Sequence, residues 1–313
     1  MKALIIDEVY EGIAQELGKY MTVETKLLPT QEELAKLIGG YDVLIMRVDP
    51  AINKEILDAA RNLKVIGVCS VGLNHIDMDT AKEKGIQVFN APGMNGNAVA
   101  ELTLAKMLEL SRHTIPADYD VTTNKHWDKY RFVGRELRGK TLGILGFGRI
   151  GQRVGELGRA FLMNVVAYDP FLPAHVFEEQ HAQSLSIAEV LRVSDFVTIH
   201  MPLTDETRHM FNAESLASMK PDAVVLNMAR GGIVDEKAMY EALKAGKIGG
   251  YATDVMEDEL AEGGLTEDAS MDSPLFECDN FIVTPHLGAQ TVDASRDVGN
   301  YIIDKVKTAL SLS

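Results

Sequence analysis

The stretch Thr141–Gly151 reads TLGILGFGRIG, and it decides the fold. Three glycines in the spacing G-x-G-x-x-G follow its apolar run, at Gly146, Gly148 and Gly151. Where a strand turns into a helix, such glycines permit a tight turn, a close approach of the backbone to a pyrophosphate, and close packing of helix against strand. The stretch therefore predicts the start of a dinucleotide-binding domain, with Arg149 and Ile150 in the first helical turn at the cofactor.

The next predicted strand, Asn164–Tyr168, ends in Asp169, which follows Gly151 by 18 residues. A carboxylate at that position can accept hydrogen bonds from the hydroxyls of the adenosine ribose, and it repels a 2′-phosphate. The order of strand, glycine turn, helix, strand and terminal acid therefore predicts NAD, rather than NADP, as the cofactor.

Short apolar runs alternate with helix-period segments along the whole chain. Four strands are predicted in the first hundred residues, at Lys2–Asp7, Val43–Met46, Val65–Cys69 and Gln87–Asn90. Six more follow, at Leu142–Leu145, Val165–Tyr168, Phe196–Ile199, Val224–Asn227, Tyr251–Val255 and Ile282–Thr284. This alternation predicts parallel sheets with helical crossovers, and the six later strands describe a complete dinucleotide-binding sheet.

Two longer helices suggest how the parts are connected. A mostly apolar helix is predicted from Asn97 to about Asn124, and a closing helix from Val292 to Leu310. If the closing helix returns to the first sheet, the chain forms two Rossmann-like α/β domains with the cofactor domain inserted into the substrate domain. The expected boundaries are 1–98 with 288–313 for the substrate-binding domain, and 99–287 for the NAD-binding domain.

The composition excludes several classes of protein. Of the 313 residues, 46 are acidic and 31 basic, and the net charge of −15 would repel nucleic acid and anionic membrane surfaces. No apolar stretch approaches the roughly 18 residues that cross a bilayer. The two cysteines, Cys69 and Cys278, provide neither a disulfide framework nor a metal-ligand spacing. We expect a cytoplasmic protein without a metal site, a nucleic-acid partner or a membrane anchor.

Three polar segments follow predicted strands, at the edge where open α/β sheets bind ligands. They are Asn227–Gly232 (NMARGG), Asp254–Glu259 (DVMEDE) and Thr284–Gly288 (TPHLG). Each also has an ordinary explanation, as a surface arginine, an acidic loop and a packed histidine respectively. Only their joint occurrence points to a site.

In this order the segments resemble the D-isomer-specific 2-hydroxyacid dehydrogenase family, across most of the chain. Ser70–Asp77 (SVGLNHID) looks like the family's substrate-side glycine loop, and Asn90–Gly93 with Val99–Glu101 like its entry into the interdomain helix. Further matches are Gly146–Gly151, His200–Thr204, Asn227–Asp235 and Thr284–Gly288. The stretch Trp127–Gly134 (WDKYRFVG) most resembles phosphoglycerate dehydrogenases, here without their appended regulatory domain.

The resemblance implies that Arg230, Glu259 and His286 are the catalytic residues. A guanidinium can hold the carboxylate or keto oxygen of the substrate through directional, charge-assisted bonds. A histidine can take the proton of the C2 hydroxyl during oxidation and return it during reduction, and a carboxylate partner favours its charged form. Glu259 is chosen over Glu257 and Asp258 by its spacing from Asp254. The family usually has proline after this glutamate.

The residue after Glu259 is Leu260 in this chain, where the family usually has proline, and this difference weakens the assignment of Glu259. Formate dehydrogenases of the family typically carry glutamine at the position of Glu259, so that chemistry is not expected. The remaining histidines lack comparable context and are interpreted as surface or packing residues: His75, His113, His126, His175, His181 and His209.

The resemblance also implies further binding residues. On the cofactor side, beyond the glycine turn and Asp169, they are His200, Pro202, Thr207, Asp254, His286 and Gly288, with Asp254 expected at the nicotinamide carboxamide. On the substrate side they are Arg47, Val71, Gly72, Leu73, Arg230 and His286, with backbone N–H groups at Gly72 and Leu73 expected at the carboxylate. A phosphorylated substrate needs a further cation, for which Arg47, Lys129 and Arg131 are candidates.

The expected reaction is NAD-dependent oxidation of a D-2-hydroxy acid, with 3-phosphoglycerate as the leading substrate. Reduction of hydroxypyruvate or glyoxylate stays open as an alternative. Co-repressors of the C-terminal-binding type share the fold and its catalytic residues but act through partners, usually with added tails, so an NAD(H) turnover assay separates that reading. The family usually forms dimers through its cofactor domain, and the apolar helix from Asn97 predicts a homodimer.

Overall fold

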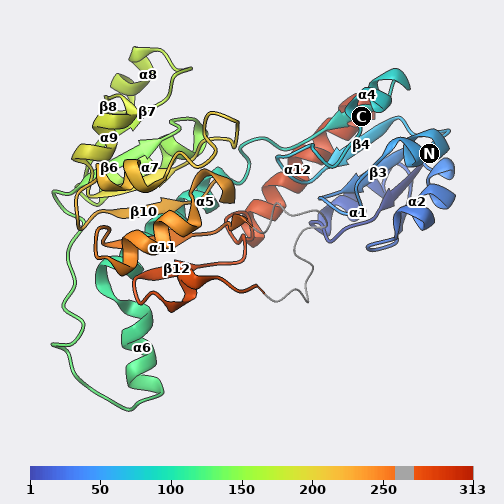
Figure 1. The fold of residues 1–313 in the computed structure, drawn as a ribbon. Helices are drawn as coiled ribbons and strands as arrows, with labels where there is room; N and C mark the ends of the chain where they lie inside the picture. Colours follow the sequence, from blue (N-terminus) through green and yellow to red (C-terminus); the bar gives the residue numbers. More distant parts are fainter. Residues whose placement is uncertain (258–270, 313) are drawn as a thin grey trace. The chain divides into compact units, whose positions relative to one another are not determined.

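The computed structural model describes residues 1–257 and 271–312 (Figure 1). The chain divides into two compact units, unit 1 from Met1–Asn95 with Ala289–Ser313 and unit 2 from Gly96–Gly288. Because the chain enters unit 2 once and leaves it once, unit 2 is inserted into unit 1. The inserted arrangement predicted from the sequence is confirmed.

Unit 1 is built on five parallel strands in the order β2-β1-β3-β4-β5. The strands are β1 (Lys2–Ile5), β2 (Thr22–Thr25), β3 (Val43–Met46), β4 (Val65–Val68) and β5 (Gln87–Phe89). The helices are α1 (Gly12–Leu17), α2 (Gln31–Leu37), η1 (Ile38–Gly40), α3 (Lys54–Ala59), α4 (Met78–Glu83) and α12 (Val292–Ala309). Two separate clusters of buried side chains cover the two faces of this sheet.

Unit 2 carries a seven-stranded parallel sheet in the order β12-β11-β10-β9-β6-β7-β8. The strands are β6 (Thr141–Leu145), β7 (Asn164–Tyr168), β8 (Gln183–Ser184), β9 (Phe196–Ile199), β10 (Val224–Asn227), β11 (Gly250–Thr253) and β12 (Phe281–Val283). The helices are α5 (Gly96–Arg112), α6 (Thr114–Thr122), α7 (Arg149–Ala160), α8 (Ala174–Glu179), α9 (Ile187–Val193), α10 (Ala213–Ala217) and α11 (Glu236–Lys244), with the short η2 (Gly231–Ile233) and η4 (Pro274–Glu277).

The central strands β9, β10 and β11 of unit 2 are mostly apolar because both of their faces are buried. Along β10, Val224 and Leu226 pack into one core cluster, while Val225 between them packs into the other. All four residues of β9, β10 and β11 are buried. Parallel sheets covered by helices on both faces require such continuous apolar runs, which is why these strands were visible in the sequence.

The closing helix α12 completes the core of unit 1. Ile302, Ile303 and Val306 of this helix are buried in the cluster that covers one face of the five-stranded sheet. The contact leaves no space for a side chain at Gly67 in β4, where a Cβ would lie 2.7 Å from Cγ2 of Ile302. The predicted return of the last helix to the first domain is thereby observed.

The structure differs from the predicted elements at the sheet edges and in one helix. β2 and β8 were not predicted, because edge strands with mostly exposed residues show no apolar run. The single helix expected from Asn97 to Asn124 is two helices, because His113 adopts a left-handed φ of 53° between α5 and α6. Among the described residues, no helix combines the length and apolar character needed to cross a bilayer.

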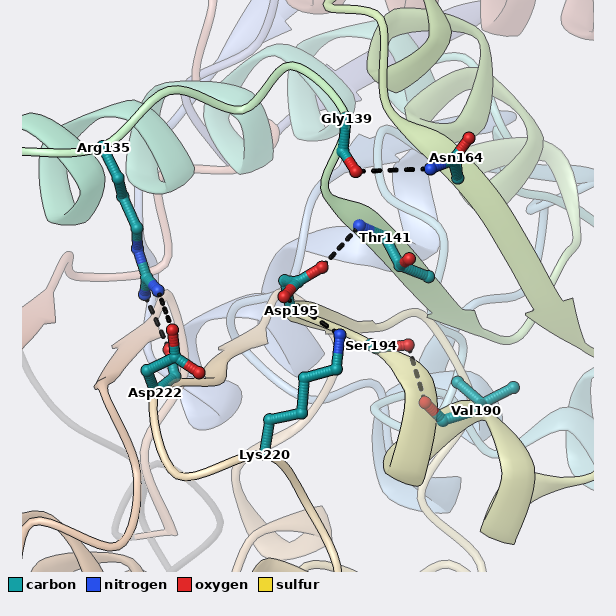
Figure 2. Close-up of polar contacts among 9 residues, drawn as sticks. All are labelled: Arg135, Gly139, Thr141, Asn164, Val190, Ser194, Asp195, Lys220 and Asp222. Atoms are coloured by element: carbon teal, nitrogen blue, oxygen red, sulfur yellow. Dashed lines mark hydrogen bonds and ion pairs between the residues drawn. The ribbon is translucent and has the colours of Figure 1, made fainter.

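Polar contacts close the amino ends of the strands in unit 2 (Figure 2). Asp195, just before β9, accepts hydrogen bonds from the backbone N–H of Thr141 at 2.7 Å and from Nζ of Lys220 at 3.0 Å. Arg135 donates to the carboxylate and the carbonyl oxygen of Asp222, just before β10, at 2.9 and 2.7 Å. The polar groups at this edge are paired with one another. The polar loops that carry the candidate site residues lie at the opposite edge.

Candidate functional site

Three glycines shape the turn between β6 and α7 at the carboxyl edge of unit 2. Gly146 has a φ of 90°, and a Cβ there would lie 2.7 Å from the carbonyl carbon of His200. A Cβ on Gly151 would lie 2.2 Å from the carbonyl oxygen of Gly146. By contrast, a Cβ on Gly148 would meet no heavy atom of the described residues within 4 Å. The turn is therefore tight on its protein side and open at Gly148, where Arg149 and Ile150 begin α7.

Asp169 ties this turn to the end of β7. Its Oδ2 accepts a hydrogen bond from the backbone N–H of Phe147 at 2.9 Å, and its Oδ1 accepts one from the N–H of Phe171 at 3.0 Å. An ionised carboxylate offers about four acceptor positions. Two of them remain for ligand hydroxyls after these backbone bonds are made.

His200 lies beside the same turn, at the end of β9. Its Nε2 is 2.9 Å from Oγ1 of Thr198, and its buried Nδ1 has no hydrogen-bond partner among the described residues. Burial lowers the pKa of His200 to about 3, so the ring is neutral at physiological pH. A buried polar atom without a partner is a group that a bound molecule can satisfy.

The loop after His200 is closed by the hydroxyl of Thr207. This hydroxyl donates to the carbonyl oxygen of Pro202 at 2.8 Å and accepts from the N–H of Thr204 at 2.7 Å. Thr207 therefore shapes the loop, whatever further contact it makes to a ligand.

These features fit a dinucleotide. The open face at Gly148, the N-terminus of α7 and the acceptor positions of Asp169 suit a pyrophosphate followed by a ribose. The orphaned Nδ1 of His200 lies behind the same turn. No group of three or more His, Cys, Asp or Glu side chains that could hold a metal occurs within residues 1–257 and 271–312.

Arg230 follows β10 and its backbone is fixed by a buried amide. Asn227 donates through Nδ2 to the carbonyl oxygen of Arg230 at 2.8 Å and accepts at Oδ1 from the N–H of Ala229 at 3.1 Å. A Cβ on the next residue, Gly231, would lie 2.1 Å from the carbonyl oxygen of Met256. The exposed Arg230 side chain is thus presented from a loop that is clamped at its base.

Asp254, after β11, holds the loop that carries His286. Its Oδ1 accepts from Oγ1 of Thr284 at 2.6 Å and from the N–H of Leu287 at 2.8 Å, while Oδ2 accepts from the N–H of Gly288 at 2.7 Å. The backbone N–H of His286 donates to the carbonyl oxygen of Asp254 at 2.9 Å. These bonds hold His286 at a left-handed φ of 52° with its side chain exposed.

Asp254 also joins this loop to the arginine segment, because its own N–H donates to the carbonyl oxygen of Asn227 at 3.0 Å. The structure therefore brings the segments of Arg230 and His286 together at one edge of one sheet. The expected contact of Asp254 with a nicotinamide amide stays a prediction.

The acidic segment after Asp254 is described only as far as Glu257, so Glu259 lies outside the described residues. The carboxylate of Glu257 contacts Nε2 of His209, and its N–H donates to Oε1 of Glu236 at 2.8 Å. Glu257 is thereby engaged with a different histidine. This favours Glu259 or Asp258, rather than Glu257, as the acid for His286.

In unit 1, the substrate-side candidates gather at the carboxyl ends of β3 and β4, which are paired neighbours. Ser70 donates to the carbonyl oxygens of Arg47 at 3.1 Å and Gly72 at 3.2 Å, and so ties the two candidate loops together. Asp7 accepts from the N–H groups of Arg47 and Val48 at 3.0 and 3.1 Å. The Arg47 guanidinium reaches Gln290 at 3.4 Å, at the start of the returning chain.

The loop that carries Val71, Gly72 and Leu73 is fixed from a second strand, because Nδ2 of Asn90 donates to the carbonyl oxygen of Val71 at 2.6 Å. Asp7, Ser70 and Asn90 thus position residues that the sequence named. Ser70 and Asn90 stand in the motifs of the family resemblance without an assigned role, and Asp7 had no signal beyond its location at a strand end.

The chain is similar to a known enzyme family over most of its length. Residues 104–288 match the family described as D-isomer specific 2-hydroxyacid dehydrogenase, NAD binding domain. A D-3-phosphoglycerate dehydrogenase of Methanocaldococcus jannaschii is 42% identical over 311 residues, which cover 99% of this chain but 57% of that protein. The chain therefore spans little more than half the length of this relative.

Two further proteins match over nearly their whole length. A hydroxypyruvate reductase of Thermotoga maritima is 39% identical over 282 residues, which cover 90% of this chain and 89% of that protein. A crystal structure of D-lactate dehydrogenase from Aquifex aeolicus, complexed with NAD and lactic acid, aligns with a TM-score of 0.81 at 30% identity. That alignment covers 99% of this chain and 96% of the other.

Proposed function

The chain belongs to the D-isomer specific 2-hydroxyacid dehydrogenase family, and from this membership we propose that it is an NAD-dependent oxidoreductase acting at C2 of a D-2-hydroxy acid. The observation that carries the proposal is Asp254. Its backbone joins the segment of Arg230, and its carboxylate holds the loop of His286. A cation for the substrate and a proton carrier thus stand on one rigid edge, beside a glycine turn suited to a dinucleotide.

When bound, NAD supplies the hydride acceptor at its nicotinamide ring. In this proposal Gly146, Gly148 and Gly151 with the first turn of α7 hold its pyrophosphate, and Asp169 holds its adenosine ribose. The other cofactor contacts are assigned to His200, Pro202, Thr207, Asp254 and Gly288. The neutral ring of His200 and the hydroxyl of Thr207 shape this side of the site without adding charge.

His286 takes the proton of the C2 hydroxyl during oxidation and returns it during reduction. Arg230 holds the substrate oxygens through its guanidinium and orients C2. Glu259 is assigned as the carboxylate that supports the charged form of His286. The Asp254 bonds fix the backbone of His286, so little reorganisation is needed when the proton moves.

Unit 1 supplies the substrate side in this proposal. Backbone N–H groups of Gly72 and Leu73 bind the substrate carboxylate, and Val71 lies beside them in the same loop. Arg47 binds a distal anionic group, because Ser70 holds its backbone beside Gly72. An arginine placed for this purpose predicts a phosphorylated substrate, and 3-phosphoglycerate is the leading candidate.

Hydroxypyruvate reduction is the second candidate, because the chain is 39% identical over 282 residues to a hydroxypyruvate reductase. Steady-state kinetics decide between them: kcat/KM is measured for 3-phosphoglycerate, hydroxypyruvate, glyoxylate and 2-ketoglutarate with NAD or NADH. His286→Ala serves as the control and should lose about 10²- to 10⁴-fold in turnover while NADH binding persists. If the wild-type protein turns over none of the four substrates, the proposal is overturned and a partner-binding role is favoured.

A homodimer is part of the proposal, but α5 does not supply its surface. α5 packs on α7 within unit 2, with Val99, Leu104 and Met107 buried. A group of exposed apolar side chains lies instead on α6 and the chain after it, which extend away from the sheet (Figure 1). The group consists of Ile115, Tyr119, Val121, Trp127, Tyr130 and Val133.

A hollow of about 490 Å³ lies beside this arm, and it suits the same arm of a second copy. Its lining combines apolar side chains of the arm itself, such as Ile115 and Tyr119, with acids that are already paired within the chain, Asp120 with Arg131 and Glu109 with Lys106. A two-fold exchange of arms would bury the exposed apolar side chains of both copies. We also assign the protein to the cytoplasm, because both cysteines are free and buried.

A further inference from the structure

His209 and Glu257 form a contact that the proposed chemistry does not use. Nε2 of His209 meets Oε1 of Glu257, and both side chains are partly exposed. His209 belongs to the chain after β9, and Glu257 follows β11, so the contact bridges the two loops on either side of the Arg230 loop in the sheet order. His209 has a φ of 49°, a left-handed conformation that costs less with glycine or asparagine.

The backbones of both residues also touch the Arg230 loop. The N–H of His209 donates to the carbonyl oxygen of Gly232 at 2.9 Å. A Cβ on Gly231 would lie 2.6 Å from the backbone nitrogen of Glu257. The side-chain contact therefore closes a ring around Gly231 and Gly232, directly after Arg230.

Side chains on two neighbouring segments also lie next to the ring. Glu236, at the start of α11, accepts from the N–H of Glu257 at 2.8 Å and so fixes it to a helix. Nη1 of Arg208 lies on the other side, 3.2 Å from where a Cβ of Gly232 would be. A residue kept in an unfavourable backbone region within such a set of contacts is a candidate for a functional role.

We propose that His209 and Glu257 are positioning residues that hold the Arg230 loop in its substrate-binding geometry, an inference that rests on the proposed role of Arg230. The cofactor residues lie earlier in the same loop, from His200 to Thr207, and have their own contacts. Thr207 is closed on Pro202 and Thr204 by its own hydroxyl. Loosening the ring should therefore weaken substrate binding and leave NADH binding unchanged.

The test is His209→Gly, which removes the imidazole and suits the left-handed backbone. His181→Gly is the matched control, because His181 has a φ of 47° at the end of α8, on a different part of unit 2. His209→Gly should raise the KM for the keto acid about fivefold, as expected for the loss of one partly exposed, charge-assisted hydrogen bond, with a smaller change in kcat. NADH Kd should stay at the wild-type value, and His181→Gly should change neither constant.

Glu257→Gln keeps a hydrogen-bonding group and should give a smaller rise in KM. Because the two residues act as one contact, the double variant should be no worse than His209→Gly alone. Additive effects in the double variant would contradict a shared contact. An equal rise in NADH Kd would show that His209→Gly disturbs the whole edge.

Hydrogen exchange gives a readout that needs no turnover. Amides in 228–236 should exchange faster in His209→Gly than in wild type, and should be unchanged in His181→Gly. Unchanged exchange in this segment refutes the positioning role. A wild-type protein that is inactive on every keto acid, with faster exchange in His209→Gly, refutes the proposed function alone.

Discussion

Oδ2 of Asp169, at the end of β7, accepts the backbone N–H of Phe147 in the glycine turn at 2.9 Å. One carboxylate therefore shapes the turn and also faces the place where an adenosine ribose is expected. These two roles can be separated by substitution, because asparagine retains the acceptor oxygen and loses the charge.

Asp169→Asn should narrow the preference for NAD over NADP by roughly tenfold, or about 1.4 kcal/mol, because the repulsion of the 2′-phosphate is removed while the turn stays anchored. Asp169→Ala should weaken both cofactors, because Phe147 also loses its acceptor. KM values for NAD and NADP in the three proteins provide the measurement. A wild-type enzyme that uses NADP as well as NAD would contradict the role given to Asp169.

Asp254→Ala should lower kcat by about tenfold to a hundredfold, because Thr284, Leu287 and Gly288 lose the acceptor that holds the His286 loop. If Asp254 acts through His286, the double variant Asp254→Ala/His286→Ala should have nearly the same kcat as His286→Ala alone. A large additional loss, together with a raised NADH Kd, would mean that Asp254 acts through its proposed cofactor contact rather than through His286.

His200 should make the stability of the protein depend on pH. Burial lowers its folded pKa from 6.5 to about 3, so below pH 6.5 the unfolded chain binds a proton that the folded chain does not. The free energy of unfolding therefore falls as pH drops from 6.5 towards 3, by at most about 1.4 kcal/mol per pH unit. Between pH 6.5 and 5.0, urea unfolding should show a loss about 1.5 kcal/mol larger in wild type than in His200→Gln. Equal losses would mean that His200 is solvated.

Trp127 is the single tryptophan of the chain and lies on the arm, 89% exposed in one protomer. If the arm docks on a second copy, its emission should move to shorter wavelengths as concentration rises, and light scattering should find twice the 34.3 kDa chain mass. Asp120→Asn should weaken both signals, because Arg131 and Asn124 hold the arm through this buried carboxylate. A 34.3 kDa species with unshifted emission at micromolar concentration rules out the dimer.

The sequence predicted the parts of the fold whose residues are buried on both faces. β9 and β10 were found at their observed bounds because every residue in them is apolar or packed. β2 was missed because three of its four residues are exposed, and the break at His113 was missed because a left-handed histidine has no sequence signal. The site residues were named from motifs, but their positions in the structure are held by contacts between residues far apart in the sequence. Gly288 meets Asp254 across 34 positions and His209 meets Glu257 across 48, and no local pattern encodes either.

The packing of α12 against β4 means that unit 1 can complete its core only after the end of the chain has been synthesised. A ribosome releases residues 96–288 before the helix that supplies Ile302, Ile303 and Val306 to unit 1. The five-stranded sheet therefore cannot cover one of its apolar faces until the last residues of the chain have left the ribosome. Truncation near the end of the chain would leave that face exposed. Unit 1 begins to be synthesised first but completes its core last, so we expect chaperones to bind mainly to unit 1.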